Sequence, residues 1–321
     1  CCAGEPSSGQ QRMRQSLKIK NPPNKKPSVA IVGAGSLATF LAAALSHAGF
    51  TITEIIARDS KPSLRRARRL AEKVGASGVT ADSARLDATL LWFCVPDREI
   101  RRAASTLANQ LVARAGLNQK GRVHFALHSS GALSSRELHP LHAAGVKVAS
   151  AHPLMTFVAG THPSLSGFQS NVPFAIEGDN AATRVARQIV RALGGESFRL
   201  SAARKAAYHA WATMTSPLLV SFLVTLEESA SAAGFAPKDA RRKSQPIIMQ
   251  TLANYSRLGP AKSFSGPLIR GDVETVRKHL AVLKKHPGAR EVYMALAQVA
   301  LRKLPVKNRD ELKRLLHDAA S

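Results

Sequence analysis

The sequence predicts an α/β fold with a doubly wound, mainly parallel sheet, followed by an all-helical second domain. Short β-type runs alternate with helical patterns from Val29 to Leu200, as is typical of a parallel sheet with crossover helices. After about Ser201 the β-type runs stop and only helical patterns follow. We therefore divide the chain into a flexible basic tail at 1–26, an α/β domain at 27–201 and a helical domain at 202–321.

The expected elements follow from this periodicity. The strands are expected at Val29–Val32, Thr53–Ala57, Ala88–Val95, Val123–His128, Lys147–Ala151, Phe174–Glu177 and Ser197–Arg199. Helices are expected between them at Leu64–Val74, Arg98–Ala113 and Ala181–Leu193. In the second domain, the helical periodicity predicts helices at 202–234, 237–257, 272–286, 288–302 and about 309–319, separated by Gly and Pro residues.

Composition favours anionic ligands. The chain carries 46 Lys and Arg against 21 Asp and Glu, a formal net charge of +25. The basic residues occur in short runs without interleaved aromatic residues to stack on bases, so nucleic acid is not the expected partner. The three cysteines show no metal spacing, which predicts no metal site and a reducing, cytoplasmic setting, with Cys94 buried.

One apolar stretch, residues 206–226, could imitate a membrane span. It contains His209 and Pro217 and is followed by Glu227 and Glu228, whereas a spanning helix needs a cleaner apolar run. We expect a helix buried between domains or subunits, no membrane insertion and a homodimer.

A glycine loop follows the first expected strand. Gly33-Ala34-Gly35-Ser36-Leu37-Ala38 fits the pattern G-x-G-x-x-A between a buried strand and a helix. The first glycine permits the turn, the second lets backbone approach a pyrophosphate, and the small third residue lets the helix pack on the strand. The predicted ligands of a dinucleotide are Gly33, Gly35, Ser36, Leu37 and Ala38, in a Rossmann-type domain.

The end of the second strand favours NADP over NAD. An NAD site usually places Asp or Glu there for the ribose hydroxyls, but this strand ends in Ala57-Arg58. Arg58 can pair with a 2′-phosphate, with Ser60 and Lys61 adding a hydroxyl and a charge. Asp59 is the counter-argument, because a shift of one residue would make it a ribose ligand.

The strand ending at Val95-Pro96-Asp97 reaches the same predicted edge. Ligands of open α/β sheets lie beyond the carboxyl ends of the strands, so the Val95-Pro96 backbone is expected beside the nicotinamide ribose. Asp97 is expected only to cap the next helix.

Two histidines also end strands at this edge. His128 is followed by Ser129 and Ser130, and His152 follows the next strand. Imidazoles exchange protons near neutral pH, and hydroxyls can hold a carboxylate or carbonyl oxygen. We predict substrate contacts from His128, Ser129, Ser130 and His152, although a single histidine at such a position is more often structural than catalytic.

The second domain supplies further candidates. Lys205 and His209 are four residues apart and so share one helix face. We predict that His209, with Lys205, protonates the atom made anionic by hydride transfer; the alternative is a solvated lysine and a packed histidine. Arg270 is predicted to hold an anionic group of the substrate or to make an interhelical salt bridge, and Asp272 to cap the next helix.

Together these motifs resemble the NADP-dependent reductases of the phosphogluconate dehydrogenase and pyrroline-carboxylate reductase type. The segments HSSGALSSRELHPLHAAGVKVASAHPLMTF, KAAYHAWATMTSPLLVSF and FSGPLIRGDVETVRKHL resemble most a bacterial family of Rossmann-like oxidoreductases with a helical C-terminal domain of unknown function. The resemblance implies a dinucleotide domain joined to a helical domain, and no defined substrate. Related reductases often place Lys and Asn one turn apart, whereas here Lys205 is followed by His209.

The expected function is transfer of hydride from NADPH to a C=O or C=N group of a small anionic metabolite. Two alternatives stay open: an NADP-binding sensor without turnover, and a basic protein associated with nucleic acid.

Overall fold

The computed structural model describes residues 26–116, 123–158 and 171–320. The predicted tail lies outside them except for Lys26. Contacts within the chain form two compact units, residues 1–209 and 210–321, and each is described here by itself.

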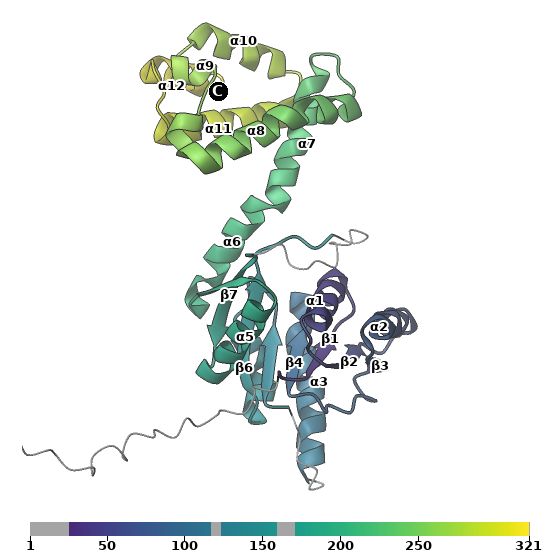
Figure 1. Ribbon diagram of the computed structural model, residues 1–321. Helices are drawn as coiled ribbons and strands as arrows, with labels where there is room; N and C mark the ends of the chain where they lie inside the picture. Colours follow the sequence, from purple (N-terminus) through teal and green to yellow (C-terminus); the bar gives the residue numbers. More distant parts are fainter. Residues whose placement is uncertain (1–25, 117–122, 159–170, 321) are drawn as a thin grey trace, which may run out of the picture. The chain divides into compact units, whose positions relative to one another are not determined.

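The first unit is built on one eight-stranded sheet (Figure 1). Its strand order is β3-β2-β1-β4-β5-β6-β7-β8, parallel from β3 to β6, with β7 antiparallel to β6 and parallel to β8. The order 3-2-1-4-5-6 is that of the Rossmann doubly wound sheet, which confirms the predicted fold class. The strands are β1 Val29–Val32, β2 Ile52–Ala57, β3 Ser77–Thr80, β4 Leu90–Phe93, β5 Phe125–His128, β6 Lys147–Pro153, β7 Pro173–Gly178 and β8 Glu196–Arg199.

The edge strand β3 was not predicted. It has four residues, none of them buried, so it lacks the apolar run that marks the other strands. Its Gly78 allows α2 to pack closely, since a Cβ atom there would lie 2.5 Å from Arg68 Cα. A strand defined by close helix packing leaves little trace in hydropathy.

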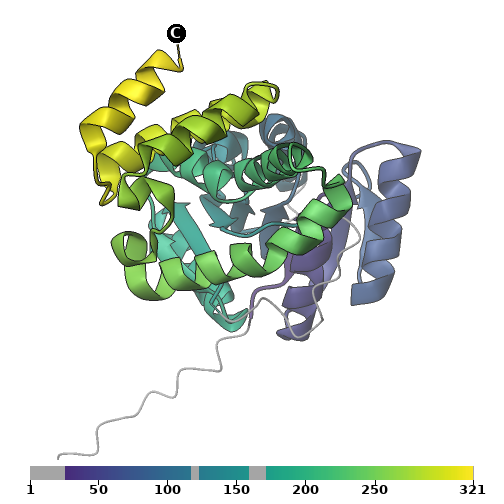
Figure 2. The same cartoon turned by 90° about the horizontal axis from the view of Figure 1, so that it is seen from above.

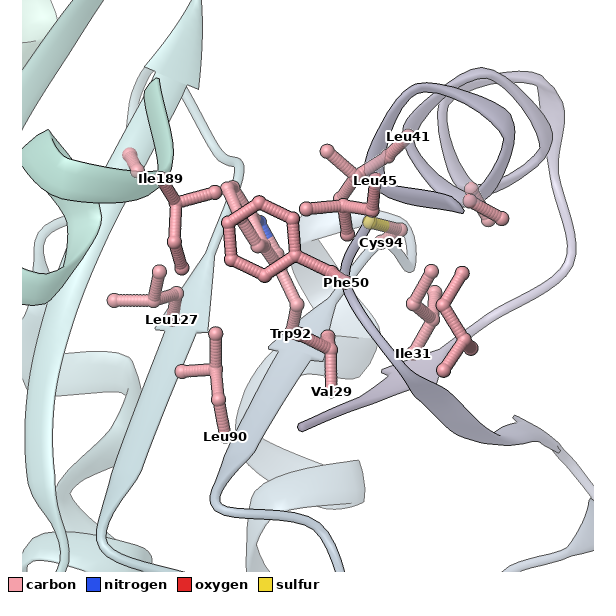
Figure 3. Close-up of a cluster of buried hydrophobic side chains, with 14 of the residues drawn as sticks. Val29, Ile31, Leu41, Leu45, Phe50, Leu90, Trp92, Cys94, Leu127 and Ile189 are labelled. Carbon is pink, nitrogen blue, oxygen red and sulfur yellow. The ribbon is translucent and has the colours of Figure 1, made fainter. Parts of the chain in front are cut away.

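Helices cover both faces of the sheet. The helices of this unit are α1 Ser36–His47, α2 Lys61–Val74, α3 Asp97–Gly116, α4 His139–Ala143 and α5 Asn180–Ala192, with short 3₁₀ turns at Ser135–Leu138 and Ala202–Arg204. Buried residues of α1, α2 and α5 share one core cluster with the sheet, and those of α3 and α4 share the other. Figure 3 shows the first cluster, in which Trp92, Leu127 and Phe50 pack beside Ile189 of α5.

Helix α6, Lys205–Thr215, runs across the division between the two units. The helices that follow are α7 Pro217–Ser231, α8 Pro237–Ser263, α9 Pro267–Arg270, α10 Val273–Leu283, α11 Pro287–Lys303 and α12 Arg309–Asp318, which carries the C-terminus in Figure 2. The core of the second unit lies between α10, α11 and α12, around Val276, Ala297 and Leu312.

The prediction of a single helix at 202–234 is wrong, because the chain forms two helices there, α6 and α7. Pro217 begins α7 because proline has no N–H to donate and fits the first turn of a helix. Helix α8 likewise extends past the expected 257 to Ser263, with non-helical backbone at Gly259 (φ 75°).

The apolar stretch at 206–226 is exposed in the single chain. Met214 is 67% and Val220 59% exposed among the described residues. Residues 202–231 are long and apolar enough to cross a membrane by length and composition alone. The expected burial of this stretch between domains or subunits stays a prediction.

Candidate functional site

The candidate site lies where the parallel strands β1, β4, β5 and β6 end. The hydrogen bonding between strands continues one residue past the ends of β1 and β4. Gly33 N donates to Ile56 O, and Cys94 N donates to Val32 O. The reversal of strand order falls between β1 and β4, the position at which open α/β sheets bind ligands.

The glycine loop has the geometry predicted for a dinucleotide. Gly33 has φ +117°, and a Cβ atom there would lie 2.4 Å from Cys94 O, so only glycine fits. Gly35, by contrast, has open space around its missing side chain. It is the N-cap of α1, whose first turn has no acidic residue and no side-chain cap, and Ala38 is fully buried against the sheet. The first-turn N–H groups can therefore meet an anion.

The end of β2 presents Arg58, Ser60 and Lys61. The Arg58 Nε atom donates to Ser63 Oγ at 3.0 Å, which fixes the side chain and leaves its terminal nitrogens for another acceptor. The Ser60 hydroxyl is buried and has no hydrogen-bond partner among the described residues. Arg58 and Lys61 are exposed. A phosphate or ribose hydroxyl at this position would satisfy the Ser60 oxygen.

The turn after β4 contacts both the glycine loop and the loop after β5. Val95 Cγ1 lies 3.2 Å from the Cβ position at Gly33, and Pro96 is exposed beside it. Asp97 begins α3, and its Oδ2 atom accepts a hydrogen bond from Ser130 Oγ at 2.8 Å. Asp97 thus lies in the first turn of α3 and anchors the loop after β5, whereas its predicted role as the helix cap stays a prediction.

The loop His128-Ser129-Ser130-Gly131 is held by its own side chains. His128 is fully buried; its Nδ1 atom accepts from Ser130 N at 3.1 Å and its Nε2 atom donates to Ser134 O at 2.9 Å. Ser129 Oγ accepts from Trp92 Nε1 at 2.9 Å, and Ser130 Oγ accepts from Leu133 N at 2.9 Å. These groups therefore shape the loop, and their predicted contact with substrate stays a prediction.

Lys205 is buried at 1% exposure against this loop. Its Nζ atom donates to Ser130 O at 2.7 Å and to Ser150 Oγ at 2.5 Å, and Ser150 Oγ donates to Ser130 O at 3.3 Å. Burial lowers the pKa of Lys205 to about 8, an effect that the negative charges of Glu177 and Asp97 oppose. Two of the three ammonium N–H groups are thus used to hold the loop in place.

Two imidazole rings border Gly131, and a phenol contacts one of them. A Cβ atom at Gly131 would lie 2.6 Å from His209 Cδ2 and 2.8 Å from His152 Nε2, so glycine is what lets both imidazoles approach the loop. The His152 Nδ1 atom lies 2.8 Å from the Tyr208 hydroxyl, and the two imidazole centroids are 6.4 Å apart. His209 is exposed and His152 is half-buried. The structure thus brings together His152, Lys205 and His209, which the sequence had placed in two domains.

Burial sets the protonation of the inner groups. Desolvation lowers the pKa of His128 and of His152 to about 4, and the positive charge of Lys205 acts in the same direction. Desolvation also raises the pKa of Tyr208 to about 12. At neutral pH, His152 is therefore a neutral imidazole and Tyr208 a protonated phenol.

Arg270 belongs to the second unit. It ends α9 and is exposed. Hydrogen bonds from Thr275 lower the pKa of Asp272, and the positive charge of Arg270 adds to this effect. Asp272 caps α10 as predicted, accepting from Thr275 N at 3.1 Å. The predicted role of Arg270 in substrate binding stays a prediction.

The sequence analysis did not predict four residues that the structure places in the site. They are Asp97, Ser150, Glu177 and Tyr208. Glu177 is buried and accepts from both the N–H and the hydroxyl of Ser135, at 2.5 and 3.0 Å. Tyr208 carried a usable signal, since it lies one helical turn after Lys205 and beside His209. Ser150 and Glu177 lie inside apolar strands and carried none. Among the described residues, no group of three or more His, Cys, Asp or Glu side chains could hold a metal ion.

Comparison with known proteins agrees with the two-part organisation. Residues 13–153 match the Rossmann-like domain and residues 172–300 match a domain of unknown function, DUF2520. The chain therefore consists of a Rossmann-like domain followed by a DUF2520 domain. A search of curated proteins gives no match.

Solved structures share the fold at low identity. A Thermotoga maritima protein is 22% identical, with a TM-score of 0.64, 91% of this chain and 100% of that chain covered. An imine reductase from Myxococcus stipitatus in complex with NADP⁺ is 14% identical, with a TM-score of 0.58 and coverages of 90% and 100%. A pyrroline-5-carboxylate reductase from Coxiella burnetii is 14% identical, with a TM-score of 0.52 and coverages of 92% and 98%. The chain thus has the fold of NAD(P)-dependent reductases.

Proposed function

We propose that this protein is an NADP-dependent oxidoreductase that reduces a C=O or C=N group of a small anionic metabolite in the cytoplasm. The observation that carries the proposal is one sheet edge that holds both an open glycine loop and a cluster of proton-exchanging side chains. Gly33 and Gly35 follow β1, and His152, with Tyr208 and His209 around it, ends β6.

The described residues fit the proposed cofactor. The loop from Gly33 to Ala38 and the first turn of α1 would hold the pyrophosphate, and Val95 and Pro96 would border the nicotinamide ribose. Arg58, the unpartnered hydroxyl of Ser60 and Lys61 would hold the 2′-phosphate. When bound, NADPH supplies the hydride, and one proton completes the reduction of the acceptor.

His209 is the proposed proton donor. Its exposed ring borders Gly131, and an imidazole can both accept and donate a proton, so it can exchange protons with solvent. Lys205 acts by holding the Ser130 carbonyl and Ser150 in place. The buried Gly131 N–H makes no hydrogen bond to any described residue, so it is available to a substrate oxygen.

Charge supports an anionic substrate. The net charge of +25 raises the local concentration of anions, and Arg270 offers two parallel donors to a carboxylate. The assignment of Arg270 rests on its chemistry alone.

A homodimer is part of the proposal. Exposed apolar side chains on α7 and α8 exceed what scattered surface residues would give; they are Leu218, Val220 and Val224 on α7, and Ile247, Met249, Leu252 and Tyr255 on α8. A second copy of the chain would remove this surface from water.

The test is a titration of the purified protein with NADPH, followed by the change in nicotinamide fluorescence, and then assays of NADPH oxidation with keto acids, aldehydes and imines. Binding together with turnover that falls in His209→Ala supports the proposal. Absence of NADPH binding overturns it. Binding that survives His209→Ala and Lys205→Ala, without turnover of any acceptor, identifies a sensor instead.

A further inference from the structure

The contact between Tyr208 and His152 joins two side chains that the proposed proton transfer by His209 does not use. Tyr208 is buried at 7% exposure, and its hydroxyl lies 2.8 Å from His152 Nδ1. Its ring meets the His152 ring edge-on at 5.4 Å and packs against Phe198 at 6.0 Å. The phenol is therefore held in one orientation relative to the imidazole.

The chemistry of this pair favours one placement of the proton. A phenol is the stronger acid and a neutral imidazole nitrogen the stronger base, so the favoured arrangement has Tyr208 donating and Nδ1 accepting. The single ring proton of the neutral imidazole then resides on Nε2. That atom lies 2.8 Å from the Cβ position at Gly131, a residue whose N–H makes no hydrogen bond to the described residues.

We propose that Tyr208 holds His152 as the Nε2–H tautomer and that this N–H donates to a substrate carbonyl oxygen, so that the reduced group is C=O rather than an iminium. This inference rests on the proposed function and names the substrate class for it. His152 is then a substrate-binding residue, and Tyr208 is a positioning residue that acts through it.

An iminium does not suit this donor. A protonated C=N group has no lone pair to accept a hydrogen bond, whereas a carbonyl oxygen has two. Burial is the main cause that lowers the pKa of His152 to about 4, and the positive charges of Lys205 and His209 act in the same direction. A cationic substrate group beside this ring would meet the same burial and the same repulsion. The nearby carboxylates Asp97 and Glu177 are engaged by Ser130 and Ser135 and face Lys205.

Proton balance is kept without ionising Tyr208. The pKa of Tyr208, raised to about 12 by burial, keeps its proton on oxygen. His152 therefore stabilises the developing alkoxide by a hydrogen bond and gives up no proton. The oxygen takes its single proton from His209 in the imidazolium form, and His209 recovers one from solvent.

The test is nitrogen-15 NMR of the histidine rings in the full chain, with the His152 signals assigned from His152→Gln. The expected wild-type spectrum at pH 7 shows a protonated Nε2 and an unprotonated Nδ1. In Tyr208→Phe the two tautomers become mixed. The matched variant Tyr293→Phe removes the hydroxyl that lies 3.1 Å from His279 Nδ1 in the second unit, and it leaves the His152 tautomers unchanged. A wild-type ring protonated at Nδ1 overturns the role of Tyr208, and this reading does not depend on the folding of any Tyr208 variant. A Tyr208→Phe spectrum equal to wild type overturns it as well.

The substrate class is read from the same signals. With NADP⁺ present, 2-keto acids and aldehydes are expected to shift the Nε2 resonance, and the permanent cation N-methyl-1-pyrrolinium is not. A shift with the cation alone, or with none of these probes, overturns the carbonyl assignment. Failure of NADPH to bind in the fluorescence titration would overturn the proposed function, while the tautomer spectrum would still decide the role of Tyr208.

Discussion

The Nζ atom of Lys205 donates a hydrogen bond to the backbone oxygen of Ser130 at 2.7 Å, across 75 positions of sequence. This contact ties the first residue of α6 to the loop after β5. It also places His209, one helical turn further, against Gly131, and Tyr208 against His152. The position of the imidazole pair therefore depends on a buried lysine that faces away from solvent.

Substituting Lys205 changes how stability responds to alkaline pH. The unfolded lysine keeps its proton up to about pH 10.5, whereas the folded one releases it near pH 8. Between these values the unfolded state binds more protons, so the free energy of unfolding of the wild type rises with pH. Relative to Lys205→Met, the wild type should gain stability from pH 8 to 10 in urea titrations. For the exposed control Lys73→Met, the free energy of unfolding should change with pH in the same way as for the wild type. If the free energy of unfolding of Lys205→Met also changed with pH as the wild type does, the assigned pKa of Lys205 would be contradicted.

The two glycines of the cofactor loop should behave differently. Gly33→Ala puts a Cβ atom against Cys94 O and forces φ +117° on alanine, so it should cost about 2 kcal/mol or more of stability. Gly35→Ala meets open space and should leave the melting temperature unchanged. It should nevertheless weaken NADPH binding about 10-fold or more, because the backbone can no longer approach the pyrophosphate. Unchanged NADPH affinity in Gly35→Ala would rule out a pyrophosphate at this position.

Arg58 should decide the choice between NADPH and NADH. Replacing it with Gln removes a charged donor whose hydrogen bond to a phosphate is worth about 1.5–3 kcal/mol. The affinity for NADPH should fall about 10- to 100-fold while that for NADH changes little. The control is Arg69→Gln, an exposed arginine on α2. Equal losses for both cofactors would argue against a 2′-phosphate at Arg58.

The apolar surface of α7 should hold the dimer together. Val220 and Val224 are 59% and 57% exposed in the single chain, and glutamates there would have to be buried in an interface. Light scattering coupled to gel filtration should give twice 34.3 kDa for the wild type and 34.3 kDa for Val220→Glu/Val224→Glu. Val112→Glu, an equally exposed site on α3, should remain dimeric. A monomeric wild type would refute the dimer.

The sequence by itself determined those features that depend on neighbouring residues. Helical and strand periodicity, the glycines at 33 and 35 and the basic end of β2 are local patterns, and they predict the Rossmann-type half, the helical half and the cofactor edge. The exposed four-residue strand β3 escaped because close packing at Gly78, and not an apolar run, defines it.

Only the tertiary structure decided the inner half of the candidate site. Asp97 with Ser130, Ser135 with Glu177 and Tyr208 with His152 are pairs separated by 33, 42 and 56 positions. Their partners are set by which strands become neighbours and by the antiparallel direction of β7. Burial then shifts the pKa of Lys205, His152 and Tyr208, and burial is a property of the packed chain that no local pattern encodes.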